Sequence, residues 1–248
     1  MKLENSIFEE KYLTSYTQTG IHGVLTNKSI LSLMERTAGL HSAYCKFSFA
    51  DIAKDNLTWI ILNWKLKVLK RPKAEERIVI QTWGRKFNKL FVIRDFKLFN
   101  SKGELYAIAS SKWCLVDTSK NKIARMPENI PEIYGGFRDE SVFDIEDLPR
   151  LREPKLDSIG VDTYKIRRFD LDINKHVHNT NYLNFAYEVL PFEIYTGEEL
   201  NNLEIYYKNE IKYGETIKSF LYFDKGVYTI ATKSEDEQTL HSIVRIYN

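Results

Sequence analysis

Apolar residues along this chain follow two spacings, and the same order of spacings occurs twice. In each half, a short extended segment precedes apolar residues at helical spacing, and four runs rich in Val, Ile, Trp, Tyr and Phe come next. The turns between the runs are short and polar. Strands that follow one another without intervening helices form a largely antiparallel sheet. The pattern therefore predicts an α+β fold in which each sheet curls around one helix.

In the first half, the predicted helix starts at a cap provided by Asn27 or Ser29. Its buried side is marked at helical spacing by Ile30, Leu33, Met34, Thr37, Ala38 and His41. The predicted strands of this half are 58–69, 77–85, 90–99 and 105–117. All four tryptophans of the chain fall in these runs, so we expect them to pack in the core or to line a cavity.

In the second half, the predicted helix covers 182–190 and ends at Pro191. The predicted strands are 203–212, 216–224, 227–233 and 239–247. Between the halves, the pattern loses regularity where prolines, a Gly-Gly pair and acidic residues gather, which is typical of a linker. We therefore expect a first domain at 1–130, a linker at 131–157 and a second domain at 158–248.

A dense group of polar residues precedes the second helix. Asp172, Asn174 and His176 stand two residues apart, so in an extended segment their side chains point to one face. Leu171, Ile173 and Val177 would then point to the other face. Taken singly, such residues before a helix are ordinary capping or turn residues. Three polar side chains alternating onto one face favour a functional site instead.

The sequence from residue 170, Asp-Leu-Asp-Ile-Asn-Lys-His-Val-His-Asn-Thr-Asn-Tyr, with Glu188 in the following helix, resembles the acyl-acyl-carrier-protein thioesterases of plants and bacteria. That family reads roughly D-x-D-x-N-x-H-V-N-N-x-x-Y, followed by a helix bearing W-x-x-E. It carries a catalytic acid on a downstream strand. Glu210, in the predicted strand 203–212, lies 34 residues after His176, a separation that matches the family. The resemblance covers most of the chain.

The resemblance implies two tandem hotdog units, each a long helix wrapped by an antiparallel sheet. It also implies hydrolysis of the thioester of acyl-acyl-carrier protein, which releases free fatty acid and terminates chain elongation. The first unit would accommodate the acyl chain, and the second would carry the catalytic residues Asp172, Asn174, His176 and Glu210. The implied partner is an acyl carrier protein with a phosphopantetheine-linked acyl chain, and no cofactor or metal is implied.

Thioester hydrolysis needs a positioned water, a base and donors for the oxyanion. Glu210 is the candidate base or nucleophile, and His176 could relay a proton or polarise the water. Asn174 could hold the carbonyl or fix the water, and Asp172 could orient His176 or a neighbouring backbone group. The sequence leaves open which of Glu210 and His176 contacts the water first.

The chain departs from the family pattern in two respects. Many plant members carry a cysteine directly after the acid, whereas this chain has Ile211, which excludes a cysteine–histidine mechanism at this position. The family's H-V-N-N reads His-Val-His-Asn here, and Phe185 stands where a Trp is common. We interpret both changes as adjustments of packing or substrate fit, and we expect His178 to face away from His176 in a turn.

The two halves differ in their chemistry. When they are aligned by their helices, the region of Asp172, Asn174 and His176 corresponds to Gly20, His22 and Val24, and the Glu210 region corresponds to Lys70 and Arg71. These nine residues are as the sequence gives them. The first half therefore lacks the polar triad and the acid, and we expect one active site per chain, in the second half.

Composition and charge narrow the classes of partner. Of the 248 residues, 43% are hydrophobic and 28% are charged, which is typical of a globular protein. The net charge is only +2, so we expect no nucleic-acid partner. We expect no membrane association and a cytoplasmic location, because no apolar run has membrane-spanning length and no signal peptide is evident. The two cysteines, Cys45 and Cys114, fit a reduced protein and no zinc spacing. A homodimer is left open.

Two other classes of function remain open. Another hotdog enzyme, either an acyl-CoA thioesterase or a hydratase, would use similar residues. A catalytically inactive acyl-binding module would require none of the four polar residues, so their joint presence argues against it.

An acidic carrier protein would need a local basic surface on this nearly neutral chain. The candidates are Lys65, Lys67, Lys70, Arg71 and Lys73 in the first half, and Arg167, Arg168 and Lys175 beside the motif.

Overall fold

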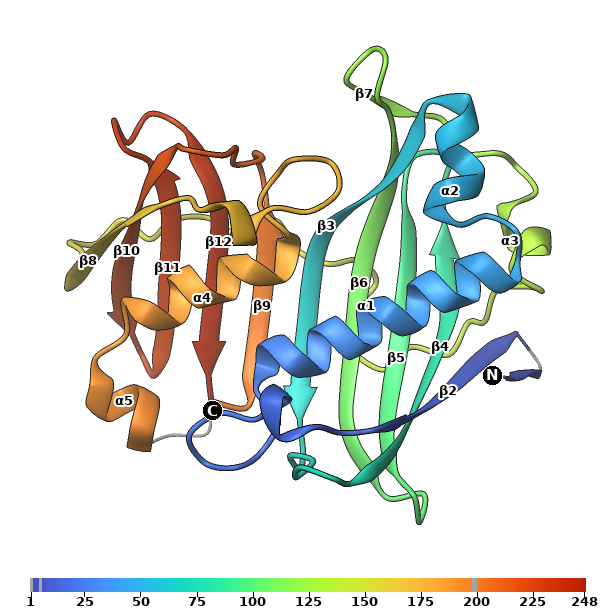
Figure 1. The fold of residues 1–248 in the computed structure, drawn as a ribbon, viewed down its shortest axis with the longest axis horizontal. Helices are drawn as coiled ribbons and strands as arrows, with labels where there is room; N and C mark the ends of the chain where they lie inside the picture. Colours follow the sequence, from blue (N-terminus) through green and yellow to red (C-terminus); the bar gives the residue numbers. More distant parts are fainter. Residues whose placement is uncertain (1, 5, 198–199) are drawn as a thin grey trace. The chain divides into compact units, whose positions relative to one another are not determined.

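The computed structural model describes residues 2–4, 6–197 and 200–248. Contacts within the chain divide it into two compact units, Met1–Leu148 and Pro149–Asn248. The division falls inside the segment 131–157 that we expect to be a linker. Each unit holds an antiparallel sheet with a helix across one face, so the mixed helix and strand content of the prediction is confirmed (Figure 1).

The first unit is built on antiparallel strands in the order β1-β2-β4-β5-β6-β3, with β7 paired to β6. The strands are β1 Lys2–Glu4, β2 Ile7–Leu13, β3 Leu57–Val68, β4 Arg77–Phe87, β5 Val92–Asn100, β6 Leu105–Asp117 and β7 Lys122–Ala124. The four predicted strands correspond to β3 to β6, with ends that differ by at most two residues. Helix α1 (Asn27–Tyr44) lies across the sheet, and short helices α2 (Phe49–Ile52) and α3 (Ile130–Ile133) flank it (Figure 1).

Helix α1 has the buried side that its sequence pattern predicts. All six residues named for that side, from Ile30 to His41, are buried. The cap is Thr26 rather than Asn27 or Ser29: its hydroxyl accepts the backbone N–H of Ser29 at 3.1 Å. The hydroxyl of Thr26 reaches a backbone N–H of the helix's first turn, so the helix begins at Asn27, one residue earlier than a cap at Asn27 would give and three earlier than a cap at Ser29.

The second unit orders its antiparallel strands β9-β12-β11-β10-β8. The strands are β8 Gly160–Lys165, β9 Asn202–Tyr207, β10 Thr216–Asp224, β11 Val227–Ser234 and β12 Leu240–Tyr247. Helix α4 (Tyr182–Glu188) is short rather than long and crosses this sheet, and helix α5 (Phe192–Gly197), which the sequence analysis missed, follows Pro191 (Figure 1). Strand β9 ends at Tyr207, five residues before the predicted end, so Glu210 lies in the following loop and not on a strand.

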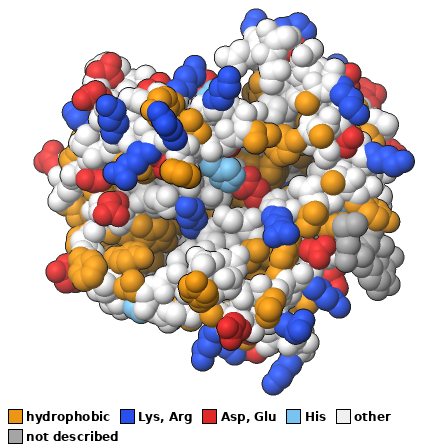
Figure 2. Space-filling view, viewed as in Figure 1, with side chains coloured by type: hydrophobic (Ala, Val, Ile, Leu, Met, Phe, Trp, Pro, Cys, Tyr) orange, Lys and Arg blue, Asp and Glu red, His pale blue; other side chains and the backbone are white. Residues whose placement is uncertain are grey.

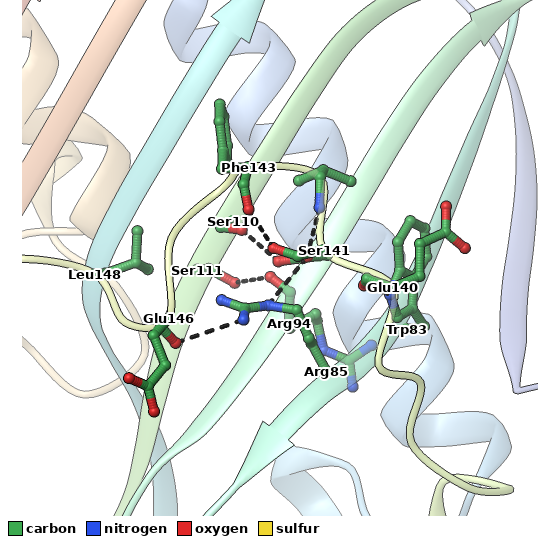
Figure 3. A network of polar contacts seen from close by, with 12 residues as sticks. Trp83, Arg85, Arg94, Ser110, Ser111, Glu140, Ser141, Phe143, Glu146 and Leu148 are labelled. Carbon is green, nitrogen blue, oxygen red and sulfur yellow. Dashed lines mark hydrogen bonds and ion pairs between the residues drawn. The ribbon is translucent and has the colours of Figure 1, made fainter.

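The last part of the first unit is a strap, residues 138–148, on the face of the sheet away from α1 (Figure 3). The backbone N–H of Val142 donates to Oδ2 of Asp95 at 3.1 Å, and the indole of Trp83 donates to the carbonyl of Glu140 at 3.1 Å. Asp95 is fully buried, lies 3.2 Å from Nε of Arg85 and accepts the hydroxyl of Ser110. A buried carboxylate that accepts several donors holds the strap to the sheet, because leaving any of them unpaired would be costly.

A buried polar layer lies between α1 and its sheet. Nη1 of Arg94, on β5, donates to Nδ1 of His41 at 3.0 Å and to the hydroxyl of Thr82 at 3.3 Å. The His41 ring stacks on Phe8 and meets Tyr134 edge-on, with ring centroids 4.9 and 5.0 Å away. Burial, with the nearby Arg94 charge, lowers the pKa of His41 to about 2. The imidazole is therefore neutral in the folded protein.

This pKa makes the stability of the fold depend on pH. The unfolded chain protonates His41 near pH 6.5, whereas the folded chain does so only near pH 2, so stability is lost as the pH falls below about 6.5. We expect this one group to contribute a slope of up to about 1.4 kcal/mol per pH unit. The measurement is denaturant unfolding between pH 7.5 and 5 for the wild type, His41→Gln and the exposed control His22→Gln. A slope left unchanged by His41→Gln would contradict the expectation.

Candidate active site

The polar motif forms a tight turn and not an extended segment. Leu171 and Val177 pair across it, and the N–H of Asp172 donates to the carbonyl of His176 at 2.8 Å. Lys175 takes a φ of 64°, in the left-handed region, which reverses the chain. The predicted alternation of faces is therefore wrong. Ile173, expected on an apolar face, is 85% exposed at the tip of the turn.

The carboxylate of Asp172 holds this turn together. Its Oδ1 accepts the backbone N–H groups of Asn174 and His176, at 2.8 and 3.2 Å. Its Oδ2 accepts the side-chain amide of Asn174 at 3.4 Å. Short polar side chains that bond the backbone two residues on are characteristic of such turns. Of the two roles considered for Asp172, the geometry fits the orientation of a neighbouring backbone group.

The turn brings His176 to Glu210. Nδ1 of His176 lies 3.3 Å from Oε2 of Glu210, and Nζ of Lys212 lies 3.4 Å from Oε1 of the same carboxylate. The side chains of His176 and Glu210 are 30% and 45% exposed, so both are held in place yet open to a ligand. With Nδ1 directed at the carboxylate, the Nε2 atom of the ring remains for another partner.

Apolar neighbours anchor both segments that carry this pair. Val177 follows His176 and Ile211 follows Glu210; both are buried in one core cluster with Tyr182 and Phe185. The N–H of Val177 donates to the carbonyl of Ile211 at 2.9 Å. Phe185, where the family commonly has Trp, thus packs in the core beneath the site. Ile211, where many plant members have Cys, does the same.

Tyr182 packs directly beneath the loop that carries Glu210. It is 4% exposed, and its hydroxyl donates to the carbonyl of Asn209 at 3.4 Å. Burial and the charge of Glu210 raise the pKa of Tyr182, so the phenol stays protonated. The hydroxyl of Tyr207 likewise donates to the carbonyl of Asn179 at 2.9 Å. Sequence reasoning missed both tyrosines as supports, because their partners are backbone carbonyls distant in sequence.

His178 has a structural role. Its Nδ1 accepts the backbone N–H of Thr180 at 3.4 Å and lies 3.1 Å from the hydroxyl of Thr180. It therefore caps the short 3₁₀ turn Asn179–Asn181 that leads into α4. Glu188, which matches the acid of the family's W-x-x-E, is exposed on α4.

The first unit contains the same turn without the chemistry. The N–H of Gly20 donates to the carbonyl of Val24 at 3.0 Å, and Gly23 takes a φ of 69° in the position of Lys175. Val24 pairs with Lys73 as His176 pairs with Lys212. The alignment of halves made from the sequence is therefore confirmed. It places Gly20, His22, Val24 and Arg71 where the second unit has Asp172, Asn174, His176 and Glu210.

The first unit has a pocket of its own beneath α1. Its empty volume, mouth included, is about 520 Å³. Most of the wall is apolar, and its polar residues include Arg94 and Tyr134. The apolar lining is Ala38, Phe49, Trp59, Val92, Trp113, Ile130 and Phe137. Trp59 and Trp113 thus line a cavity as expected, while Trp64 and Trp83 are in the core.

A metal site and a membrane-spanning helix are two further features that the described residues could provide. In that part of the chain, no group of three His, Cys, Asp or Glu side chains is placed to hold a metal ion. None of its helices is both long and apolar enough to cross a membrane.

Comparisons with known proteins agree with the geometry. The chain is similar over 86% of its length to a chloroplastic oleoyl-acyl carrier protein thioesterase 2 of Arabidopsis thaliana, with 25% identity. It is similar over 88% of its length to a chloroplastic palmitoyl-acyl carrier protein thioesterase of Cuphea hookeriana, with 24% identity. The chain spans 62% and 55% of the lengths of these two relatives.

Solved structures show the same fold. An acyl-ACP thioesterase from Bacteroides thetaiotaomicron matches with a TM-score of 0.86 at 21% identity, covering 100% of this chain and 99% of that one. A 12:0-ACP thioesterase from Umbellularia californica matches with a TM-score of 0.86 at 18% identity, covering 100% and 98%.

Family models match most of the sequence. The model for the acyl-ACP thioesterase N-terminal domain matches residues 5–134, and the model for the C-terminal domain matches residues 154–246. These two matches cover most of the chain, and the second includes both the turn at Asp172–His176 and Glu210 in the loop after β9. The chain belongs to the acyl-ACP thioesterase family.

Proposed function

We propose that this chain hydrolyses the thioester of acyl-acyl-carrier protein and releases free fatty acid, which terminates chain elongation. The observation that carries the proposal is the 3.3 Å approach of His176 to Glu210 in a family of thioesterases. We also propose that each unit is a hotdog, because each has one helix across an antiparallel sheet preceded by the same turn.

In the proposed reaction, His176 and Glu210 act as one acid–base unit. Water attacks the thioester carbonyl, and the pair takes the proton that the water loses. The C–S bond then breaks, and the departing sulfur takes a proton from the pair, which leaves a fatty acid and a thiol. One amide hydrogen of Asn174 is directed at Asp172, so its other amide hydrogen can be donated to the carbonyl oxygen.

The first prediction tests the pair. Glu210→Gln and His176→Ala should each lower kcat by about two orders of magnitude, the usual effect of losing an acid–base group. The assay is release of thiol from a purified acyl-acyl-carrier protein, with folding checked by circular dichroism. Glu235→Gln, an exposed carboxylate of the same unit, and His22→Ala, in the equivalent turn of the first unit, are the controls. Near wild-type kcat in a folded Glu210 or His176 variant would remove that residue from the mechanism.

The second prediction concerns the thiols. Cys114 is buried and its pKa is raised to about 11 by burial, so it stays protonated at neutral pH. Burial also raises the pKa of Cys45. We expect the double variant Cys45→Ser, Cys114→Ala to keep kcat within about threefold, since a thiol that is not ionised is a poor nucleophile. A large loss of kcat in a folded double variant would mean that a thiol takes part.

A mixed basic and apolar surface flanks the turn. We call Arg168, Phe169, Ile173 and Lys175 the docking patch: all are exposed, and Phe169 is 100% exposed. Figure 2 shows Lys and Arg side chains interspersed with hydrophobic ones over the second unit. An acidic partner with an apolar contact face fits such a surface.

Two of the basic candidates of the first unit, Lys70 and Arg71, fit this role less well. Nζ of Lys70 lies 3.2 Å from Glu104, and Nη1 of Arg71 donates to the carbonyl of Leu25 at 3.1 Å. Both cations therefore already have partners within their own unit, whereas the docking patch lies next to the catalytic turn in sequence. We propose the docking patch as the binding surface for the carrier protein.

The third prediction tests this assignment. Arg168→Glu with Lys175→Glu should raise KM for the carrier-protein substrate about tenfold or more and leave KM for a small acyl thioester nearly unchanged. The matched control reverses two exposed lysines elsewhere in the unit, Lys155→Glu with Lys225→Glu. Wild-type KM for the carrier substrate should also rise with salt, because salt screens the encounter. Equal effects on both substrates would favour an acyl-CoA thioesterase.

A further inference from the structure

The pocket of the first unit contains a buried positive charge without an acidic partner. Arg94 lines the pocket and is 6% exposed. Its contacts within the described chain are neutral: Nδ1 of His41, the hydroxyl of Thr82 and the face of the Tyr134 ring, 5.1 Å from the guanidinium carbon. No carboxylate of the described residues forms an ion pair with it. Buried charges in proteins are ordinarily paired, so a buried guanidinium with only neutral contacts indicates that a ligand could supply its missing acceptor.

Two other buried donors, one on His41, which contacts Arg94, and one in the pocket wall, also lack acceptors. His41 accepts from Arg94 at Nδ1, so its proton is on Nε2, and Nε2 is buried with no hydrogen-bond partner in the described structure. The indole N–H of Trp59, which belongs to the pocket wall, is buried and has no hydrogen-bond partner in the described structure either. Unsatisfied buried donors are uncommon, and one in the pocket wall, together with one on the residue that accepts from Arg94, indicates that an acceptor belongs in or beside the pocket.

The pocket wall also includes a carboxylate, Glu35, at a different position along α1 from the end where Arg94 lies. Glu35, Ala38, Gly39 and Ser42 form the stripe of α1 that faces the pocket. The hydroxyls of Ser42 and Tyr134 are hydrogen-bonded at 2.8 Å, and the Arg94 guanidinium lies over the Tyr134 ring. Ser42 therefore marks the Arg94 end of the pocket. Glu35 is seven residues earlier, about 10 Å along a helix. The pocket thus has an electropositive end and a mainly apolar body.

We propose that this pocket binds an acyl chain that carries an oxygen acceptor, a hydroxyl or a carboxylate, on the end that enters the pocket, and that Arg94 is the donor that selects it. A methyl-ended chain would leave the guanidinium desolvated and without a counter-charge. An oxygen-bearing end would accept from Arg94 and satisfy it. The inference rests on the proposed function for the identity of the ligand as an acyl chain, and it adds the class of acyl chain.

The test is equilibrium binding to the full chain, which needs no turnover. The probes are three amide analogues of a medium-chain acyl-pantetheine, identical except for a far end that is methyl, hydroxyl or carboxylate. Binding is followed by calorimetry and by tryptophan fluorescence, because Trp59 and Trp113 line the pocket. The hydroxyl and carboxylate probes distinguish a neutral acceptor from an anion.

For the wild type, we expect at least one oxygen-ended probe to bind about tenfold more tightly than the methyl-ended probe, the scale of a hydrogen bond to a charged group. Arg94→Met should abolish this preference while the methyl-ended probe binds as before or better. Arg77→Met, which removes an exposed cation of the same unit, should leave the preference unchanged. Trp59→Phe, which keeps an aromatic ring and removes the donor, should weaken the preference partially.

The wild-type series alone decides the proposal if Arg94→Met does not fold. Equal or tighter binding of the methyl-ended probe by the wild type would overturn it, as would a preference that survives in a folded Arg94→Met protein. Hydrolysis of three acyl-acyl-carrier proteins, whose acyl chains end in methyl, hydroxyl or carboxylate, is measured in parallel. Hydrolysis without an oxygen preference in binding would refute this inference alone, whereas an oxygen preference in binding without hydrolysis of any of the three substrates would refute the proposed function alone.

Discussion

The site depends on one backbone hydrogen bond between two anchored segments. The N–H of Val177 donates to the carbonyl of Ile211, and both side chains are buried in the core of the second unit. His176 and Glu210 each precede one of these anchors, so the distance between their side chains is set by packing and a main-chain bond, and not by two flexible loops. Preorganisation of this kind is what an acid–base pair needs, because a displacement of about 1 Å can cost a large factor in rate.

The same backbone arrangement in the first unit has a different use. Gly20, Val24 and Arg71 occupy the positions of Asp172, His176 and Glu210, so the turn is kept while the carboxylates and the imidazole are absent. The first unit instead has a pocket between α1 and its sheet, with Arg94 in its wall. Our proposals thus give the same backbone turn a reactive pair in one unit and a binding cavity in the other, and function would then be determined by side chains placed on a common fold.

The sequence predicted the strands and the main helix well, because their periodic apolar residues face a core. It predicted the positions of the polar residues less well. Ile173 and Asp172 were assigned to an extended segment because alternation alone does not reveal the left-handed φ of Lys175, a non-glycine residue. The strap could not be foreseen either: its polar, acidic sequence between proline-containing stretches is typical of a linker, and its contacts with Asp95 and Trp83 join residues far apart in sequence. Arg94 gave no signal, since an Arg within a strand is usually exposed.

The central claim is that His176 and Glu210 act as one unit, and a double-mutant cycle on kcat tests it most directly. Residues that act as a unit have strongly non-additive effects, so the variant with both Glu210→Gln and His176→Ala should have a kcat close to that of the slower single variant. If the two losses in kcat instead multiplied, the residues would act independently, and the 3.3 Å contact would not be the catalytic feature of the site.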